Sequence, residues 1–355
     1  MAQLKTVLTQ QLLGSINCAM RINDTNGEGA AAFREGRVWR MLIAGRNLMQ
    51  VGVLAAGLLT LLACVSWIAD LLANLRMQLV VAGVVATAVA LLSKQWKTLL
   101  VQLLLLSLHT SWIILPARRA EVGVGLADIT VTSINAYIHN DQHAMIAARL
   151  SDLSADVITV TELSPALYEQ LMVVFATSHP FAAAQPQSGS FGVGIFSKYP
   201  LSDIAMIGTD TTGKSLLATV QLRDQNYRVV AVHPYSPMTP WRFDLRNQHF
   251  KALSQAVQTV HQRQPETLCI VMGDFNSTPW SPHFRRFQRA SGLYHVAQGS
   301  GVTPTWYAPG PTMFPFGLVL DHCMVSPRLA CISCCIGPSV GSDHLPLTVQ
   351  LSLRR

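Results

Sequence analysis

The sequence predicts an α/β sandwich over residues 120–355, preceded by three helices that cross a membrane. Two observations support this prediction. Three long apolar stretches without a charged residue lie in the first third of the chain, and beyond residue 127 apolar runs typical of strands alternate with amphipathic patterns typical of helices. Half of the 355 residues are hydrophobic and only 13% are charged, a composition too apolar for an ordinary soluble enzyme. The apolar excess therefore belongs to the first part of the chain.

Three uncharged stretches are candidates for membrane helices, at residues 47–69, 77–93 and 98–117. A bilayer core of ~30 Å requires about 20 apolar residues of helix, and the first and third stretches reach this length while the second is slightly short. Helices buried in a protein core are the alternative. Such helices normally keep a polar face, and residues 80–92 and 99–108 have almost none. We therefore expect a three-helix transmembrane region.

The basic residues that flank this transmembrane region, residues 47–117, predict its orientation. Residues 1–46 are polar and form the expected cytoplasmic N-terminal segment, loosely structured. Eight basic residues lie on the side of this segment: Lys5, Arg21, Arg34, Arg37, Arg40, Arg46, Lys94 and Lys97. The opposite side has three, which are Arg76, Arg118 and Arg119. Because cytoplasmic loops carry the excess of Lys and Arg, we expect a multi-pass protein of a bacterial inner (cell) membrane, with residues 120–355 periplasmic or extracellular.

The elements of the sandwich follow in order from local patterns. Apolar or alternating runs predict nine strands, at residues 128–136, 156–163, 192–197, 215–222, 227–233, 268–274, 318–325, 330–336 and 345–353. Amphipathic patterns predict four helices, at residues 141–153, 164–175, 241–263 and from about 281. Ser164 is a typical N-cap, with Pro165 in the first helical turn. The polar residues 223–226 form a hairpin turn between two of the strands.

The net charge says little about partners. Its formal value of +7 partly reflects the basic flanks of the membrane region, so it is weak evidence for a nucleic-acid partner. A basic run at Arg285, Arg286 and Arg289 lies on a predicted helix. A solvated helix face is favoured there over a substrate-binding patch.

The seven cysteines include a cluster with the spacing of a zinc site, at Cys331, Cys334 and Cys335. No second Cys or His pair stands nearby to complete a tetrahedral set, so we interpret these residues as apolar strand cysteines. In an oxidising compartment, a disulfide within the cluster stays open as an alternative.

Polar residues with metal- or phosphate-binding side chains recur at the ends of the apolar strands. The positions are Asn135, Glu162, His233, Asp274 with Asn276, Asp321, and Asp343 with His344. A single such residue is usually a turn or cap residue, but six positions are hard to attribute to turns. Asp274 and Asn276 can converge on one ligand, because side chains at i and i+2 share a face. Carboxylate and amide oxygens suit a hard cation and an imidazole suits proton transfer, so the set fits water attack on phosphorus.

In this order, the residues resemble the motifs of the endonuclease/exonuclease/phosphatase superfamily. The Gly-Asp-Phe-Asn motif at 273–276 and the Ser-Asp-His motif at 342–344 carry most of the resemblance. The Gly-Val-Gly-Ile-Phe-Ser-Lys-Tyr-Pro segment at 192–200 is similar to an internal strand of that superfamily. The resemblance covers residues 127–355 and implies a deoxyribonuclease I-like fold, a sandwich of two sheets flanked by helices.

The resemblance implies a divalent-metal site. Glu162 would be the main carboxylate ligand, Asn135 would contact metal or phosphate beside it, and Asp343 would assist on the metal side. Mg²⁺ is the expected ion, with Mn²⁺ or Ca²⁺ as alternatives, because the ligands are oxygens.

The resemblance also implies catalytic roles. Asp274 would orient or activate the attacking water, while Asn276 and His233 would hydrogen-bond phosphate oxygens. His344 would act as the general acid/base, oriented and kept charged by Asp321. This pairing also has a physical reason, since a carboxylate within ~4–6 Å favours the charged imidazole.

Some positions depart from the family pattern or extend it. Pro234 stands where many members have a Leu-rich or Asn-containing stretch, so a phosphate contact could pass to Arg242 or Arg246. Helix solubility explains these two arginines equally well. His322 is either an outward-facing strand residue or a site residue. Trp306 resembles the family's loop that borders the substrate, with an aromatic lid over the core as the alternative.

These observations predict a membrane-anchored, divalent-metal-dependent phosphoester hydrolase, with a phosphodiesterase or nuclease as the leading hypothesis. The alternative is a phosphatase or phosphodiesterase directed at phospholipids or inositol phosphates. A non-catalytic membrane scaffold is a weaker alternative, because no residue of the catalytic set is missing. The expected partners are a phosphoester substrate, either nucleic acid or a phospholipid headgroup, and the lipid bilayer. No protein partner is predicted.

Overall fold

The computed structural model of the chain describes residues 28–114, 119–209, 213–296, 302–307 and 316–354. The chain divides into two compact units, residues 1–52 and residues 53–355. The second unit contains the sandwich and most of the apolar helices, so the candidate site can be described within it.

The described apolar part of the chain consists of helices α2 (Glu28–Leu59), η1 (Thr60–Leu62), α3 (Trp67–Asn74), α4 (Arg76–Leu92) and α5 (Trp96–Ile114). By length and composition, Arg37–Leu62 and Trp96–Ile114 are able to cross a membrane. Helices α3 and α4 meet at a bend of 74° and provide a third candidate if they are counted as one span. Two or three helices are thus long and apolar enough to span a bilayer.

Two details of this region differ from the sequence prediction. Helix α2 begins at Glu28, so the prediction of a loosely structured segment up to residue 46 is wrong for its last part, while residues 1–27 lie outside the described chain. The expected first span, residues 47–69, is interrupted after η1. A new helix, α3, begins there because Ser66 is its N-cap and accepts a hydrogen bond from Ala69 N at 3.4 Å. Hydropathy alone does not reveal this signal.

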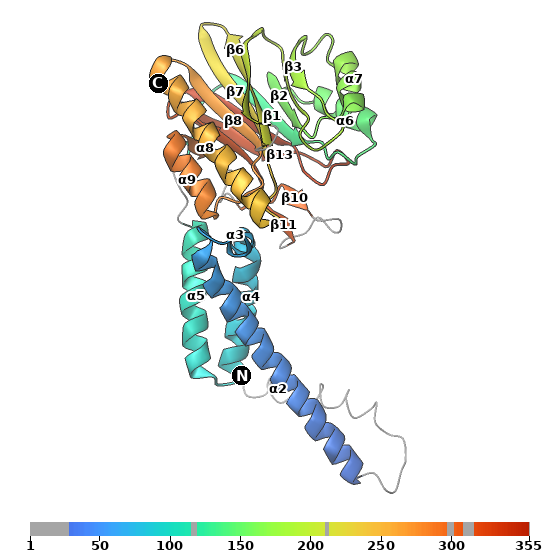
Figure 1. Cartoon of the computed structure of the whole chain (residues 1–355), viewed down its shortest axis with the longest axis vertical. Helices are drawn as coiled ribbons and strands as arrows, with labels where there is room; N and C mark the ends of the chain where they lie inside the picture. The colour runs from blue at the N-terminus through green and yellow to red at the C-terminus, as the bar shows by residue number, and fades with distance from the viewer. Residues whose placement is uncertain (1–27, 115–118, 210–212, 297–301, 308–315, 355) are drawn as a thin grey trace. The chain divides into compact units, whose positions relative to one another are not determined.

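The described strands form two six-stranded sheets and a two-stranded ribbon (Figure 1). In spatial order, the first sheet contains β13 (Leu329–Ile336), β14 (Leu347–Leu353), β1 (Ile129–Asn135), β2 (Val157–Thr161), β4 (Val193–Ser197) and β3 (Phe181–Gln185). The second contains β5 (Leu201–Thr209), β6 (Gly213–Leu222), β7 (Gln225–Pro234), β8 (Leu268–Asp274), β12 (Asp321–Val325) and β9 (Tyr294–Val296). The ribbon consists of β10 (Trp306–Tyr307) and β11 (Gly317–Leu318). The predicted two-sheet α/β sandwich is confirmed.

The two sheets bury their apolar faces against each other. This core includes the fully buried side chains of Val131, Ile195, Ala231, Met272 and Val349. Strand β1 runs parallel to β2 in the first sheet, and β7 runs parallel to β8 in the second. The carboxyl ends of neighbouring parallel strands lie at the same edge of a sheet. Residues that end or follow these strands are therefore brought together, which decides where the candidate site lies.

Four helices cover the outer faces of the sheets: α6 (His143–Ser151), α7 (Pro165–Val174), α8 (Pro240–Arg263) and α9 (Pro282–Ser291) (Figure 1). Helices α6 and α7 share an apolar cluster with Ile158 and Phe196 of the first sheet. Helices α8 and α9 share another with Val230 and Met324 of the second. A Ser or Thr N-cap followed by proline starts α7, α8 and α9, as the sequence predicts for α7 at Ser164.

Several short strands have no strong sequence signal. Strands β3, β5, β9 and β10 are absent from the sequence prediction: β3 is mostly alanine, β9 and β10 are very short, and β5 is irregular at Asp203, where φ is +47°. The strand predicted at residues 318–325 is divided into β11 and β12, so Asp321 starts a strand rather than lying inside one. The strand is interrupted there because the N–H groups of Leu320 and Asp321 donate to Thr305 Oγ1, at 3.1 and 2.9 Å, instead of to a neighbouring strand.

The cysteine cluster lies in β13, as expected for strand residues. Cys331 and Cys334 are half-buried, Cys335 is exposed, and all three are free thiols. No disulfide links the described cysteines.

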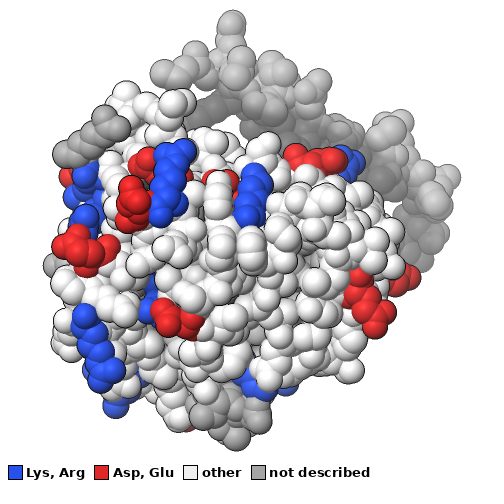
Figure 2. All heavy atoms as spheres, turned by 90° about the horizontal axis from the view of Figure 1, so that it is seen from above, with Lys and Arg blue, Asp and Glu red and all other residues white. Residues whose placement is uncertain are grey.

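Charged side chains are sparse and mixed on the face of the molecule shown in Figure 2. Lys and Arg are interspersed with Asp and Glu, and no continuous basic stripe crosses this face. Some basic residues of the sandwich are also neutralised by ion pairs, including Arg328 with Glu266 and Arg354 with Glu121. This face therefore lacks the positive track that binds a nucleic-acid backbone.

Gly273 is required by the backbone at the end of β8. Its φ is +143°, and a Cβ there would collide with the backbone carbonyl of Val232 on β7. We expect Gly273→Ala to lower the free energy of unfolding by about 3 kcal/mol, because strain and overlap act together. Thermal unfolding of the full chain in detergent measures the effect. The control is Gly189→Ala, where nothing lies within 4 Å of the added atom. Equal melting temperatures for both variants would contradict the expectation.

Candidate active site

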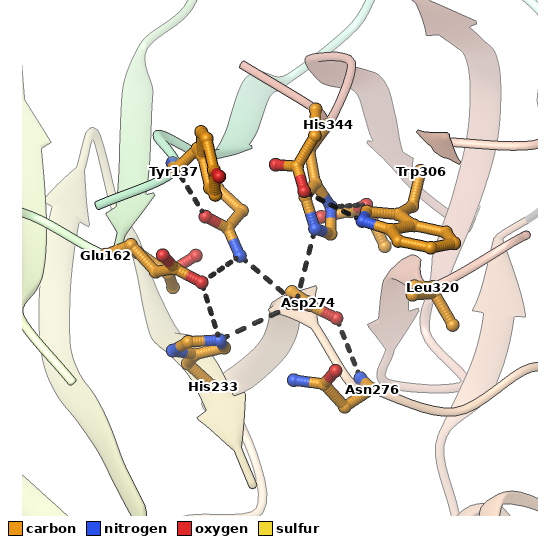
Figure 3. A network of polar contacts seen from close by, with 12 residues as sticks. Tyr137, Glu162, His233, Asp274, Asn276, Trp306, Leu320 and His344 are labelled. Carbon is orange, nitrogen blue, oxygen red and sulfur yellow. Dashed lines mark hydrogen bonds and ion pairs between the residues drawn. The ribbon is translucent and has the colours of Figure 1, made fainter. Parts of the chain in front are cut away.

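The predicted polar residues meet at one edge of the sandwich. Asn135 ends β1, Glu162 follows β2, His233 lies near the end of β7, and Asp274 ends β8. The two parallel strand pairs direct their carboxyl ends to this edge, the usual place of a ligand site in such sheets. Figure 3 shows Glu162, His233 and His344 arranged around Asp274. Residues from both sheets therefore contribute to a single site.

Asn135 and Asp274 form the centre of the network. Asn135 Nδ2 donates to Glu162 Oε1 at 3.0 Å and to Asp274 Oδ2 at 3.1 Å. His233 Nε2 lies 3.6 Å from each of the same two oxygens. One oxygen of each acid is thus shared between an amide and an imidazole. These contacts link the first sheet to the second at the site.

His344 approaches Asp274 from the other side. Its Nε2 lies 3.6 Å from Asp274 Oδ2, and its Nδ1 lies 2.7 Å from Asp321 Oδ2. Strands β12 and β8 are antiparallel neighbours, and their register places Asp321 directly opposite Asp274. The imidazole therefore lies between two carboxylates. A carboxylate on Nδ1 fixes both the orientation of the ring and the nitrogen that faces the site.

The centre of the network is shielded from water, whereas one side is open. Asn135, Asp274 and His344 each expose 4% of their surface or less. Glu162 and Asp343 are only partly buried. Buried charges interact more strongly than charges in water and must be paired. The site therefore combines a closely paired interior with a more accessible acidic side.

The interior charges set the protonation states at neutral pH. Burial would lower the pKa of the His344 imidazole, but the charges of Asp321 and Asp274 outweigh it and raise this pKa to about 10. Burial would raise the pKa of the Asp274 carboxyl, but the charges of His344 and His233 lower it to about 2. Burial would also lower the pKa of His233, but the hydrogen bond and charge of Asp274 raise it. His344 is thus a proton donor and Asp274 an ionised acceptor.

A change at Asp321 is expected to alter the pH dependence of activity. Asp321→Asn removes a charge that raises the pKa of His344, so the alkaline limb of kcat/KM moves from near pH 10 to lower pH. The raised pKa also means that the charged His344–Asp321 pair stabilises the folded chain. This contribution to the free energy of unfolding is fully present below the ordinary imidazole pKa of 6.5 and is lost as the pH rises through about 10. Asp203→Asn, outside the site, is the control. An unchanged alkaline limb in Asp321→Asn would contradict this expectation.

Three residues at the site have a backbone conformation that is rare outside glycine. The φ angles of Tyr137, Glu162 and Asn276 are +60°, +54° and +48°. The hydrogen bond from Asn276 N to Asp274 Oδ1, at 2.7 Å, stabilises one of these turns. Asn276 Nδ2 donates to Pro234 O at 3.0 Å. The predicted phosphate contact of Asn276 would therefore have to replace or share this bond.

The open side of the site has carboxylate oxygens, from Glu162 and Asp343, that suit a divalent cation as ligands. No group of three His, Cys, Asp or Glu side chains converges on one metal position among the residues that the structure describes. Burial raises the pKa of the Asp343 carboxyl, and the nearby charge of Glu162 adds to this rise. A cation between these two carboxylates would relieve their repulsion. Mg²⁺ typically binds one or two carboxylates and completes its shell with water and phosphate oxygens, so the donors present suit it.

The amide of Asn135 is engaged at both ends. Besides its two donated bonds, its Oδ1 accepts from Tyr137 N at 3.0 Å. Asn135 therefore orients the acids around it, and its predicted contact with metal or phosphate would need the remaining lone pair of Oδ1.

Two sequence hypotheses about neighbouring residues are wrong, and a third is wrong in part. Arg246 is fully buried and lies 2.8 Å from Asp70, so it is neither a phosphate ligand nor a solubilising surface residue. His322 is 1% exposed and does not face outward. The expected solvated face fits Arg286 and Arg289, which are exposed, but not Arg285, whose guanidinium stacks on the ring of Trp112 at 4.1 Å.

Trp306 lies at the border of the site. Its Nε1 donates to Asp343 Oδ2 at 2.9 Å, and its backbone forms an isolated antiparallel bridge with His344. The half-buried indole therefore holds the more accessible carboxylate in place. This position fits the predicted loop that borders the substrate.

Two hydroxyl groups orient the site, although the sequence prediction gives neither of them a role. Thr305 Oγ1 accepts from Asp321 N at 2.9 Å, which fixes the start of β12. Ser342 Oγ donates to Asn135 O at 2.7 Å, which ties the loop before His344 to β1. Their sequence positions could have indicated this role, because Thr305 directly precedes Trp306 and Ser342 directly precedes Asp343, and hydroxyls next to functional side chains frequently orient them.

Comparisons with known proteins agree with this geometry. The model of the endonuclease/exonuclease/phosphatase family matches residues 135–344, which contain all of the polar residues at this edge. No curated protein matches the chain.

Several solved structures have a similar fold. The catalytic domain of human nocturnin, with a bound sulfate anion, is 18% identical, with 65% of this chain and 97% of that chain covered at a TM-score of 0.51. The 3′ phosphatase NExo from Neisseria, bound to a product DNA hairpin, is 20% identical, with 63% and 99% covered at 0.50. An endonuclease/exonuclease/phosphatase from Beutenbergia cavernae is 16% identical, with 63% and 71% covered at 0.51. These identities establish a common fold only.

Proposed function

Because the chain belongs to the endonuclease/exonuclease/phosphatase family, we propose that it is a membrane-anchored phosphoester hydrolase that depends on a divalent cation. The main support is the buried network in which the imidazole of His344 lies 3.6 Å from the carboxylate of Asp274. The site thus supplies both a proton donor and an ionised acceptor, the two groups that general acid–base hydrolysis of a phosphoester needs. This arrangement suits hydrolysis by water without a covalent intermediate.

The chain's own residues would divide the reaction between them. The carboxylate of Asp274, ionised at neutral pH, orients the attacking water and accepts its proton as the new P–O bond forms. His344, held protonated by Asp321, gives a proton to the leaving oxygen as the old P–O bond breaks. His233 Nε2 donates to a phosphate oxygen and stabilises its charge in the transition state. Asn276 assists at the phosphate if its bond to Pro234 O is exchanged.

Glu162 and Asp343 are the proposed ligands of the cation, with Asn135 beside them. When bound, the cation supplies positive charge that neutralises the phosphate oxygens. Mg²⁺ is the proposed ion, with Mn²⁺ or Ca²⁺ as alternatives, because every proposed ligand atom is an oxygen.

The first proposed substrate class is a phosphodiester in nucleic acid. The similarly folded Neisseria 3′ phosphatase was solved with product DNA, which supports this choice. The mixed charge of the face in Figure 2 argues against a long nucleic-acid track there. A phospholipid or inositol-phosphate headgroup is the second candidate, favoured by the apolar helices that would keep the site close to lipid.

A substrate panel separates these candidates. The full chain, purified in detergent and reconstituted in lipid nanodiscs, is given plasmid DNA or vesicles of phospholipid and phosphoinositide, each with Mg²⁺ or with EDTA. We expect Mg²⁺-dependent cleavage of DNA. Release of headgroup or phosphate from vesicles without cleavage of DNA would establish the second candidate. Absence of metal-dependent turnover on every phosphoester would contradict the proposed function.

We propose that the apolar helices anchor the chain in a bacterial inner membrane, with residues 120–355 on the periplasmic or extracellular side. The excess of basic residues before the first span and between the later ones supports this orientation. Alkaline phosphatase fused after Arg119 is expected to be active, because it folds only after export. An inactive fusion that is nevertheless expressed would reverse the orientation.

A further inference from the structure

Polar side chains on helix α3 contact the sandwich next to the candidate site. Asp70 and Asn74 are 0% and 5% exposed, although they belong to the apolar part of the chain. Asp70 Oδ2 lies 2.8 Å from Arg246 Nη1 of α8, and neither side chain is exposed. Ion pairs that are fully removed from water are stable only with well-matched geometry. The Asp70–Arg246 pair therefore fixes how α3 packs against α8.

Both α3 side chains also bond to the loop that follows the candidate catalytic Asp274. Thr278 donates from its backbone N and its Oγ1 to Asn74 Oδ1, at 2.6 and 2.9 Å. Ser281 Oγ donates to Asp70 Oδ1 at 2.7 Å. Asn74 Nδ2 donates to Asp70 O at 2.9 Å, which orients the amide toward the loop. We call Asp70 and Asn74 of α3, together with their partner Arg246 of α8, the α3 polar cluster.

The same loop is fixed at its other end within the site. Asn276 N donates to Asp274 Oδ1 at 2.7 Å, and Asn276 Nδ2 donates to Pro234 O at 3.0 Å. Ser277 O contacts the His322 ring at 2.8 Å. The loop is thus held by site residues at one end and by the α3 polar cluster at the other. Only three residues separate Asp274 from Thr278, so the chain between the α3 attachment and the candidate catalytic carboxylate is short.

Further contacts make the attachment broader than a single pair. His283 Nε2 lies 3.1 Å from Ala63 O, and Gln78 Nε2 donates to Gly317 O at 3.0 Å. Arg285 reaches from α9 to the end of α5, where it bonds to the carbonyl of Trp112. A flexible tether would not need such contacts, because a linker only limits distance. The apolar helices and the sandwich are instead joined through directional polar bonds.

We propose that helix α3 is a positioning element of the active site: the α3 polar cluster holds the loop at residues 275–281 so that Asp274 faces His344. Asp70, Asn74 and Arg246 are positioning residues that act through the loop, and they do not touch substrate. The kinetic part of this inference rests on the proposed hydrolase function, whereas its structural part does not. The membrane region would then be a component of the catalytic unit in addition to being an anchor.

The test uses the full chain in nanodiscs and the variant Asn74→Ala, which removes both acceptor contacts to Thr278 and leaves the Asp70–Arg246 pair intact. Hydrogen–deuterium exchange of the segment 276–279 is expected to accelerate by about tenfold or more, because its outer attachment is lost. The kcat is expected to fall by about 10- to 100-fold with KM unchanged, because the substrate contacts remain and the geometry of attack is lost. Thr87→Ala is the matched control, since its hydroxyl bonds only within α4, to Gly83 O.

Unchanged exchange in Asn74→Ala would overturn the inference, whether or not the chain proves to be a hydrolase. Faster exchange with an unchanged kcat would also overturn it. The loop would then be attached to α3, but this attachment would not position Asp274 for the reaction. If Asn74→Ala does not fold, Thr278→Val is measured in the same way with a smaller acceleration expected, since it removes the hydroxyl bond to Asn74 at 2.9 Å and keeps the backbone bond at 2.6 Å. Absence of activity in the wild-type chain would contradict the proposed function alone, and the exchange measurement would still decide the attachment.

Discussion

Replacement of Asp274 by asparagine is expected to slow phosphoester hydrolysis by roughly 10²- to 10⁴-fold. The substitution keeps the shape of the side chain, and its Oδ1 can still accept from Asn276 N, as Asp274 does at 2.7 Å. It removes the charge that orients water and that raises the pKa of both His344 and His233. Initial rates of wild type and variant, measured at equal concentrations of folded protein, provide the comparison.

The matched control for this variant is Asp128→Asn. Asp128 Oδ2 accepts from Leu353 N at 2.7 Å away from the site, and an asparagine can keep this bond. Its rate should stay close to that of wild type. Circular dichroism and a melting curve establish that Asp274→Asn is folded before rates are compared. A folded Asp274→Asn variant with wild-type activity would exclude Asp274 from the chemistry.

Removal of divalent cations is expected to abolish hydrolysis, and addition of Mg²⁺ should restore it. The charges of Glu162 and Asp343 repel each other in the absence of a cation, and the phosphate of a substrate would add further negative charge at the same side. Glu162→Gln should raise the Mg²⁺ concentration needed for half-maximal activity by about tenfold or more, because it replaces a charged ligand by a neutral one.

Titration of activity with Mg²⁺ after treatment with EDTA measures both effects. Glu169→Gln is the control, because Glu169 is an exposed residue of α7 with the same side chain. Full activity in excess EDTA would contradict the metal dependence. An unchanged Mg²⁺ requirement in Glu162→Gln would remove Glu162 from the proposed ligands.

Much of the fold could be predicted because its strongest signals are local. The buried strands β1, β2 and β8 read as apolar runs, and polar residues follow each of them directly. In parallel pairs such ends share an edge, so the proximity of Asn135 to Glu162 and of His233 to Asp274 follows from topology, whereas the meeting of the two pairs depends on how the sheets pack. The placement of His344 and Asp321 depended on the family resemblance, since nothing local indicates that β12 lies beside β8.

The contacts between distant parts of the chain could not be predicted. Arg246 reads as an ordinary charged residue of an amphipathic helix, and its partner Asp70 reads as a polar interruption among apolar residues. Their meeting depends on how α3 packs against α8, which no local pattern encodes. For the same reason, Arg285 reads as solvated although it stacks on Trp112. Weak strands such as β5 are formed by pairing with a neighbour rather than by their own sequence.

The proposed role of His344 is tested most sharply by the rate at which the full chain cleaves a DNA oligonucleotide with Mg²⁺, measured beside the variant His344→Gln, because the alkoxide that leaves from DNA needs a proton. We expect wild type to release cleaved DNA steadily and a folded His344→Gln to lose this release, because its amide cannot serve as the proton donor held by Asp321. Equal rates in the two proteins would contradict the account, because the imidazole between Asp274 and Asp321 would then have no part in the reaction.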